Sequence, residues 1–422
     1  MLARLPGALL PAMFGLLAGC GGGPQLLGGR MPGASGSGGA ETIDASTVTD
    51  TAMETMPRLG TDGRLEAIAP RPTVCNGAGF FPTAPNSATV RCIGPIADSA
   101  YHNALCSCGD LTWLAPLVTD SFNPTTGARG SLGSVGINGY VSAMQPFHIG
   151  GSLSIAGQPP GKPGLATFGQ PSDVAGDLRI GGGMAGESPL TVGGDVFSSG
   201  SVIGTSISVG GAIHLPVNDL VVGAMATNGV VHEAVTVDAP CSCATPVINI
   251  ASVVAALQQT NGNAAVGISS DALAALAGQQ VVDLPCGNYA FSQLGGGDAT
   301  LHVGGEVVAA IAGDVSPTGT LAVMLAANAA LDLFVGGNLD LSGVTVFGDV
   351  TAPARVRLYV AGTRVSLPAG NGVGASIYAP AAMVTAAAGA ELSGALTGKQ
   401  FALLAGMTVH YDESNATARS CP

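Results

Sequence analysis

The cysteines are the residues of this 422-residue chain whose chemistry is easiest to predict. Cys20 directly follows an N-terminal apolar stretch, and eight more cysteines come after it. An even number of cysteines in an exported chain indicates disulfide bonds, although the many ways of pairing them leave the connectivity open. The eight candidates for disulfide bonds are Cys75, Cys92, Cys106, Cys108, Cys241, Cys243, Cys286 and Cys421.

Two pairs of these cysteines share the pattern Cys-Ser-Cys, at residues 106–108 and 241–243. Zinc sites usually separate paired thiolates by about two to four residues, and the thiols of exported proteins are usually oxidised, so we expect no metal here. Because alternate residues of a strand share a face, both sulfurs of each motif should point outward, each towards a partner. We predict pairing of Cys75 with Cys92, and of Cys286 with Cys241 or Cys243.

Aspartates that follow glycines are the carboxylates best suited to acid–base chemistry. Enzymes that hydrolyse polysaccharides need such carboxylates to converge, with an acid and a base about 5–10 Å apart. The aspartate of a glycine corner more often caps its own backbone, which favours a structural role. The glycine-aspartate repeat of calcium-binding solenoids does not occur in the sequence. The candidates are Asp177, Asp195, Asp314 and Asp349.

His410-Tyr411-Asp412 places a base and an acid on alternate residues, which share a face of a strand. The same geometry allows a hydrogen bond that closes the last turn of a repeat, and that structural role is the commoner one. Other histidines, including His148 and His302, are scattered without a nearby cysteine or acid cluster. We therefore predict no catalytic residue, no cofactor site and no metal site.

The elements that carry these residues repeat, most clearly between Ile377 and Asp412. Two copies of one pattern align there. The paired residues of the two copies are separated by the same number of residues in the first three pairs and by slightly fewer in the last pair. Short apolar strands and glycine corners at a period of about 20 residues indicate a solenoid, whose turns bury their apolar faces against each other. The aligned pairs are Ile377 with Leu396, Ala379 with Gly398, Val384 with Leu403, and Gly389 with Gly406.

The same unit, an apolar residue, a glycine corner and a second apolar residue, recurs along much of the chain. The corner glycines Gly176, Gly194 and Gly211 follow one another at nearly equal intervals. Glycine suits such corners because it tolerates positive φ and close backbone approach. We therefore predict a mainly β fold, a parallel β-helix, in two parts at residues 131–215 and 301–412.

The other segments are predicted to cover or interrupt this β-helix. Residues 63–130 contain four cysteines and indicate a disulfide-stapled N-terminal cap over the open end of the solenoid. Residues 216–300 indicate a small α+β insertion, with helical spacing at Ile248–Gln258 and Asp271–Ala277. Residues 413–422 are a short C-terminal tail.

Residues 1–19 have the order of a secretory signal, in which Arg4 precedes an apolar stretch too short to span a bilayer. The segment ends Leu17-Ala18-Gly19-Cys20, which resembles the lipobox of bacterial lipoproteins. That resemblance implies a cleaved signal peptide, acyl chains such as palmitate on Cys20, and sorting to the outer membrane because Gly21 follows the cysteine. Residues 20–62, rich in Gly, Ser, Pro and Thr, are then a flexible tether.

Composition narrows the classes of partner. The net charge of −13 disfavours nucleic acid, because phosphate binding needs a basic surface. Only 10% of the residues are charged and 65 are glycine, which suits narrow stacked turns with a core of small and branched side chains. After the signal, no apolar run is long enough to span a membrane.

Three further stretches carry a second resemblance: Leu331–Asn338, Ile377–Ala381 and His410–Asp412. They resemble an uncharacterised β-helical domain of bacterial pilus-associated and surface proteins and of lipoproteins from myxobacteria-like bacteria. The resemblance extends over roughly residues 131–412 and implies a β-helix in the cell envelope, with no catalytic residues to carry over.

The expected function is therefore a non-enzymatic, lipid-anchored structural or adhesion protein of the envelope. Its expected contacts are the membrane, through the lipid on Cys20, and envelope polysaccharide or other surface proteins. Its body would face the periplasm or the cell exterior. The alternative is a carbohydrate-active β-helix enzyme, either a polysaccharide lyase or a hydrolase.

Overall fold

The computed structural model describes residues 58–59, 65–66, 80–85, 90–157, 165–243, 246–403 and 405–417. The chain divides into two units, residues 1–68 and 69–422. The described part of the first unit is one antiparallel pair, β1 (Arg58–Leu59) with β2 (Leu65–Glu66). The predicted signal peptide, Cys20, most of the tether, Cys75 and Cys421 lie outside the described residues.

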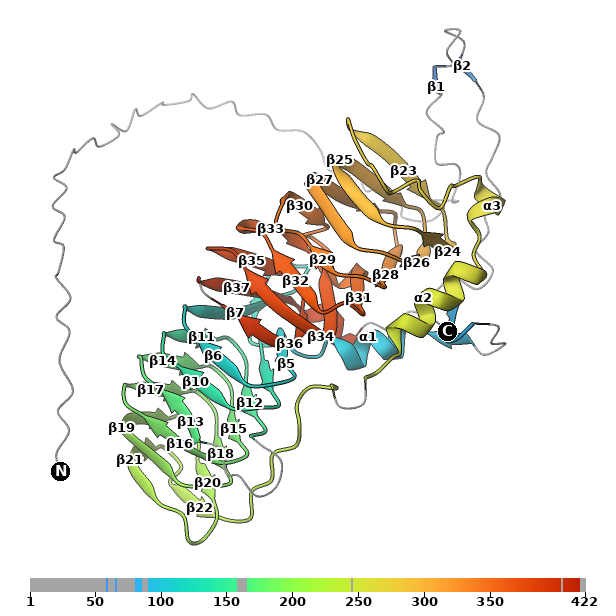
Figure 1. Cartoon of the computed structure of the whole chain (residues 1–422). Coiled ribbons are helices and arrows are strands. Elements are labelled where there is room, and N and C mark those ends of the chain that lie inside the picture. Colours follow the sequence, from blue (N-terminus) through green and yellow to red (C-terminus); the bar gives the residue numbers. More distant parts are fainter. Residues whose placement is uncertain are drawn as a thin grey trace, which may run out of the picture. The chain divides into compact units, whose positions relative to one another are not determined.

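The second unit is dominated by one sheet of 33 strands, in which the strands of successive turns pair in parallel (Figure 1). Three short strands make up one turn of the chain, and each strand pairs with the corresponding strand of the next turn. The strands therefore form three ladders around a common core. This arrangement is mainly β and is consistent with the predicted solenoid.

The strands of the first ladder follow one another in this spatial order: β24 (Gly287–Phe291), β26 (Glu306–Ile311), β28 (Ala330–Val335), β31 (Val356–Val360), the start of β34 (Ser376–Ala386), the start of β36 (Leu396–Ala402), β5 (Leu105–Ser107), β9 (Val135–Ile137), β12 (Leu153–Ile155), β15 (Leu178–Ile180), β18 (Val196–Ser198), β20 (Ile213–Leu215) and β22 (Val230–His232).

The second ladder has two runs. One contains the starts of β25 (Leu294–Val303) and β27 (Val315–Leu325), then β29 (Leu339–Asp340), β32 (Arg364–Leu367) and the ends of β34 and β36. The other contains β6 (Leu111–Trp113), β10 (Val141–Ala143), β13 (Leu165–Phe168), β16 (Gly183–Gly186) and the starts of β19 (Val202–Val209) and β21 (Val221–Ala226).

The third ladder contains β23 (Gln280–Leu284), the ends of β25 and β27, β30 (Val344–Gly348), β33 (Gly370–Gly374), β35 (Ala390–Ser393), β37 (Met407–Asp412), β7 (Leu117–Phe122), β11 (Phe147–Ile149), β14 (Ser172–Val174), β17 (Leu190–Val192) and the ends of β19 and β21.

A few elements lie outside the ladders. β3 (Phe80–Pro82) pairs antiparallel with β4 (Val90–Cys92), and β8 (Arg129–Gly130) pairs antiparallel with β7. The helices are α1 (Gly94–Ala100), α2 (Ile250–Gln259) and α3 (Asn263–Val266), with short 3-10 turns η1 (Pro353–Arg355) and η2 (Glu413–Thr417).

The spatial order of the turns differs from their order in the chain. Residues 105–232, the first half-stack, wind from β5 to β22, and residues 280–412, the second half-stack, wind from β23 back to β37. The second half-stack ends against the beginning of the first, where β36 pairs with β5 and β37 with β7. We call this joint the seam. In Figure 1 the cyan strands β5–β7 lie between the red strands and the green ones.

The predicted N-terminal cap is therefore wrong for residues 105–122, which form a central turn of the stack. Leu105 of β5 faces Leu396 on one side and Val135 on the other. Trp113, predicted to lie in the cap, is fully buried and packs on Phe147 with ring centroids 4.9 Å apart. The sequence could not distinguish these positions, because a central turn and a cap both contain short apolar strands.

The predicted α+β insertion is shorter than expected, because β21 and β22 continue the first half-stack and β23 already begins the second. Residues 233–243 and 246–249, which we call the strap, run along the outside of the stack between β22 and α2 (Figure 1). The helix predicted at 248–258 matches α2, whose N-cap Asn249 accepts a hydrogen bond from the Ser252 amide. The second predicted helix is wrong: residues 271–277 form turns, and Leu276 bridges to Gly296.

The doubled pattern of residues 377–412 is confirmed in part. Ile377 faces Leu396 and Ala379 faces Gly398, as predicted. Val384 faces Phe401 instead of Leu403, because the register shifts between Ala379 and Met383.

Candidate functional site

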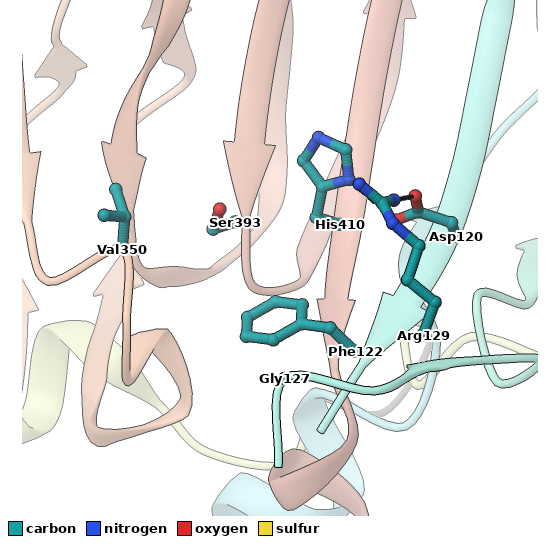
Figure 2. Close-up of a pocket in the computed structure, with 7 residues that line it drawn as sticks. All are labelled: Asp120, Phe122, Gly127, Arg129, Val350, Ser393 and His410. Atoms are coloured by element: carbon teal, nitrogen blue, oxygen red, sulfur yellow. Dashed lines mark hydrogen bonds and ion pairs between the residues drawn. The ribbon is translucent and has the colours of Figure 1, made fainter. Parts of the chain in front are cut away.

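An open hollow of about 240 Å³ lies beside the seam, on the outer surface of the third ladder (Figure 2). Strands β35, β37 and β7 form its floor, and the segment that leads to β8 forms one side. The lining residues are Asp120, Phe122, Gly127, Arg129, Val350, Ser393 and His410.

Strand register brings three of these side chains into one row. Ser393 faces His410, and His410 faces Asp120, so the three occupy equivalent positions on β35, β37 and β7. The preceding residue of each strand is buried in the core, and alternate residues of a strand point to opposite faces, so the row points outward. Two of the three strands belong to one half-stack and the third to the other.

Hydrogen bonding within the row couples the two half-stacks. His410 Nδ1 lies 2.6 Å from Asp120 Oδ1, and its Nε2 lies 3.8 Å from Glu391 Oε2. Arg129 also forms an ion pair with the Asp120 carboxylate. The hydrogen bond to Asp120 raises the pKa of His410 above its ordinary value, although burial and the nearby Arg129 oppose this rise.

The row Ser393, His410 and Asp120 has the residue types of a nucleophilic triad but lacks its connection. A triad needs the nucleophile hydrogen-bonded to the base. No hydrogen bond joins the Ser393 hydroxyl to His410 within the described part of the chain, and the distal nitrogen of His410 lies towards Glu391 instead. Asp120 is held by two basic partners, His410 and Arg129, and the hollow is smaller than the roughly 300–1,000 Å³ of typical ligand pockets.

His410 and Asp412 do not form a base–acid pair, and the role of Asp412 is structural. The Asp412 carboxylate is buried and accepts hydrogen bonds from the Ala354 amide at 3.0 Å and from the Ser414 amide at 2.9 Å. It therefore fixes two short turns. The acid partner of His410 comes from a strand 290 residues away, because the seam joins distant parts of the chain.

The histidines are also less isolated than the sequence suggests. Four of them lie against a carboxylate of a neighbouring turn, where pairing between turns supplies the acid. The pairs are His148 with Asp173, His214 with Glu233, His302 with Asp283, and His410 with Asp120.

The aspartates of the glycine corners mostly cap the next turn rather than their own. The Asp195 amide donates to Asp177 Oδ1 at 3.0 Å, and the Ala212 amide donates to Asp195 Oδ1 at 2.7 Å. Asp314 likewise accepts from the Asn338 amide at 2.7 Å. Asp349 alone of the four caps its own turn, by accepting from the Thr351 amide at 2.9 Å. These carboxylates satisfy backbone donors at the corners of the stack.

The two Cys-Ser-Cys motifs are disulfide-bonded to each other, Cys106 with Cys241 and Cys108 with Cys243. The predicted pairing of Cys286 with Cys241 or Cys243 is therefore wrong, although Cys286 is disulfide-bonded. The predicted partner of Cys92, Cys75, lies outside the described residues. Equal spacing explains the pairing: both bonds span 135 residues, so the two motifs lie alongside each other in register.

Further contacts hold the strap against the seam. The Asn138 side chain donates to the Cys241 carbonyl and accepts from its amide, both at 2.9 Å. The Tyr378 hydroxyl donates to the Ser242 carbonyl at 2.8 Å. Gly136 lies against the Cys106–Cys241 disulfide, and a Cβ at this position would meet both sulfur atoms at 3.1 Å.

A buried ion pair on the first ladder was not predicted. Arg357 Nη2 and Nε lie 2.6 and 2.7 Å from the two oxygens of Asp332, and both side chains are almost completely buried. Burial lowers the pKa of Arg357, but the Asp332 carboxylate more than offsets this, so the net pKa is raised. The repeat spacing between β28 and β31 was the available signal, since it places residue 357 on residue 332.

The described residues form neither a cluster of metal-ligating side chains nor a membrane-spanning helix. No three side chains among the described His, Cys, Asp and Glu residues are grouped so as to hold a metal ion. No helix in the described ranges is long and apolar enough to cross a membrane.

Comparison with known proteins gives one match. A family model described as a domain of unknown function (DUF7305) matches residues 231–418. The matched part begins within β22, just before the strap, and includes the second half-stack, whereas nearly all of the first half-stack lies outside it. No curated protein and no solved structure matches the chain.

Proposed function

We propose that this chain is a non-enzymatic, lipid-anchored protein of the bacterial envelope, attached to the outer membrane through Cys20. In this proposal its parallel β-helix is a rigid scaffold that presents a flat strand surface to envelope polysaccharide or to other surface proteins. The resemblance of residues 17–20 to a lipobox supports the anchor.

A continuous column of outward side chains on the third ladder is the observation that carries the scaffold proposal. Register places these residues one above another across the seam, without a break between the half-stacks. Neighbouring members are one strand spacing apart, about 4.8 Å, which gives a regular surface suited to an extended polymer. The column contains Glu391, Thr408, Val118, His148, Asp173, Thr191, Ser208 and Met225.

The anchor is tested by metabolic labelling with palmitate and by fractionation of cells that express the chain or its Cys20→Ser variant. The proposal expects label in the outer-membrane fraction and loss of label in the variant. Protease treatment of intact cells then tells exterior from periplasmic exposure. An unlabelled chain recovered from the soluble fraction would refute the anchor.

Binding is tested with a panel of envelope polysaccharides. Thr191→Arg puts a long side chain on the column, and Ser154→Arg puts the same side chain on the first ladder. The proposal expects the first variant to weaken binding by roughly tenfold or more, and the second to leave it unchanged. Equal effects of the two variants would contradict a role for the column.

A carbohydrate-active enzyme is the second candidate, because Asp120, Arg129 and His410 converge on one hollow with Glu391 nearby. In such an enzyme, Glu391 is the carboxylate least committed to internal pairing. Release of sugar ends from the same polysaccharides tests this candidate. Activity that Glu391→Gln abolishes, and that the remote Glu187→Gln retains, would replace the non-enzymatic proposal.

A further inference from the structure

The stack has one uncovered end, formed by β21 and β22 of the first half-stack. Val230 continues an inward column whose two preceding members, Val196 and Ile213, are completely buried. Val230 itself is 45% exposed, because no further turn covers it. Among the described residues, β21 pairs only with β19 and β22 only with β20, so the outer edges of both strands have no partner strand. Core side chains and backbone hydrogen-bonding groups are both left open at this end.

The opposite end is covered. Residues 261–277 lie over β24 and β25, where the Asn263 side chain donates to the Ala290 carbonyl at 2.6 Å and accepts from the Ala290 amide at 3.0 Å. Leu273 and Leu276 are buried there, and Tyr289 of the terminal strand β24 is only 1% exposed. The first two ladders are therefore covered at this end. In the third ladder the outer edge of β23 has no strand partner among the described residues, but its inward residues Val282 and Leu284 are buried.

The uncovered end lacks the features that normally prevent association of strand edges. Residues 217–232 contain no lysine, arginine or proline. Lysine, proline or a covering segment usually protects such edges. Asp219 is already engaged by the Ser201 hydroxyl at 2.9 Å. The large apolar side chains exposed here are Val217, Leu220, Val222, Met225, Val230 and Val231.

The seam demonstrates that turns of this kind join through strand edges alone. There β37 pairs with β7 over six residues, although the two strands are far apart in the chain. The uncovered end offers the same kind of edge, with the same inward apolar column behind it.

We propose that the uncovered end binds the uncovered end of a second copy of this chain. A two-fold axis relates the copies, so that β22 runs antiparallel to β22 of the partner and the two apolar columns become one. Because a two-fold contact uses the same end of both copies, it closes on itself and gives a dimer rather than a filament. This dimer requires neither the proposed lipid anchor nor the proposed polysaccharide partner.

Sedimentation equilibrium of the exported full chain carrying Cys20→Ser tests the proposal, because no lipid can then drive association. We expect a concentration-dependent monomer–dimer equilibrium. Val230→Glu should raise the dissociation constant at least ~10-fold, because it would bury an unpaired charge in the contact. The control Val281→Glu changes an exposed valine of β23 at the covered end and should leave the constant unchanged.

Circular dichroism must show that both variants keep the fold, and Val231→Cys gives a second test that does not depend on destabilising the contact. Val231 is the middle residue of β22, so antiparallel pairing about the two-fold axis places the two introduced thiols opposite each other. We expect a disulfide-linked dimer on oxidation. A chain that stays monomeric, forms filaments, or dimerises equally well with Val230→Glu would overturn the proposal.

Discussion

The two ends of the stack solve the same problem differently. Every turn of a solenoid needs a neighbour on each side, and the terminal turns lack one. At the β23 end, α3 and the turns after it cover β24 and β25, and Asn263 replaces the lost strand contacts of Ala290. At the β22 end the next residues leave as the strap, and Val230 stays half-exposed.

This difference teaches where the cap of this molecule is encoded. Residues 261–277, which cover one end of the stack, come after the first half-stack and before the second in the chain. The first half-stack therefore ends at β22 without a covering segment, whereas the second half-stack is preceded by its own. The strap makes this order feasible, because it carries the chain along the stack and is fixed at the seam by two disulfides. The two ends therefore have unequal stability and unequal capacity for contacts.

The largest predicted effect contrasts ion pairs in the two half-stacks. Arg357→Met strands a buried carboxylate and should lower the free energy of unfolding by about 3–5 kcal/mol. Arg179 pairs with Asp177 at 3.0 Å in the first half-stack, where both side chains are at least one-third exposed, so Arg179→Met should cost less than about 1 kcal/mol. Urea unfolding measures both.

The double variant Asp332→Leu/Arg357→Met is the control for that contrast. Replacing both charges with apolar side chains removes the stranded carboxylate and should restore most of the stability. Equal losses for the two single arginine variants would contradict the burial of the Asp332–Arg357 pair.

The next effect concerns the strap that connects the two ends. Removing both disulfides, by alanine at Cys106, Cys108, Cys241 and Cys243, should cost about 2–5 kcal/mol. Removing only the Cys106–Cys241 bond should cost much less, because the remaining bond closes a loop of the same length in the unfolded chain. Thermal unfolding of the three proteins checks this, and additive losses would contradict it.

A smaller effect compares the ends directly. Asn263→Ala leaves the buried carbonyl and amide of Ala290 without their partners and should cost about 1–3 kcal/mol. Asn228→Ala changes an exposed residue of the turn before β22 and should stay within about 0.5 kcal/mol. Comparable losses would show that the two ends are equally covered and would remove the contrast between them.

The smallest effect lies at the seam and depends on pH. The pKa of His410 is raised in the folded state, so the proton on His410 stabilises the fold. This contribution is complete below the ordinary histidine pKa of about 6.5 and disappears as the pH rises through the raised value. Unfolding free energies between about pH 5.5 and pH 9 should therefore fall more steeply for the native chain than for His410→Gln. Identical pH profiles would refute the coupling of His410 to Asp120.

Local patterns were enough to predict turns of the stack but not their order. The glycine corners at Gly176, Gly194 and Gly211 correctly indicated stacked turns, and register places Leu178, Val196 and Ile213 in one column. The match of Val384 with Leu403 failed, because the corner after Ala379 is two residues longer than the one after Gly398, and aligned letters do not reveal corner lengths.

The seam and its hollow depend on contacts that no local pattern contains. Asp120 and His410 meet only because β37, the last strand of the second half-stack, pairs with β7 at the beginning of the first half-stack. The equal spacing of the two Cys-Ser-Cys motifs was the one signal in the sequence that brings a distant segment to this part of the stack, because it pairs the strap with β5. Taking Cys286 as a partner obscured it.

Hydrogen–deuterium exchange of the exported Cys20→Ser chain tests the central claim, the unequal ends, most directly. At a concentration where the chain is monomeric, we predict fast exchange for the amides of residues 221–232 and slow exchange for those of residues 287–291. Raising the concentration should protect residues 221–232 and leave residues 287–291 unchanged. Slow exchange of residues 221–232 in the monomer would contradict the uncovered end.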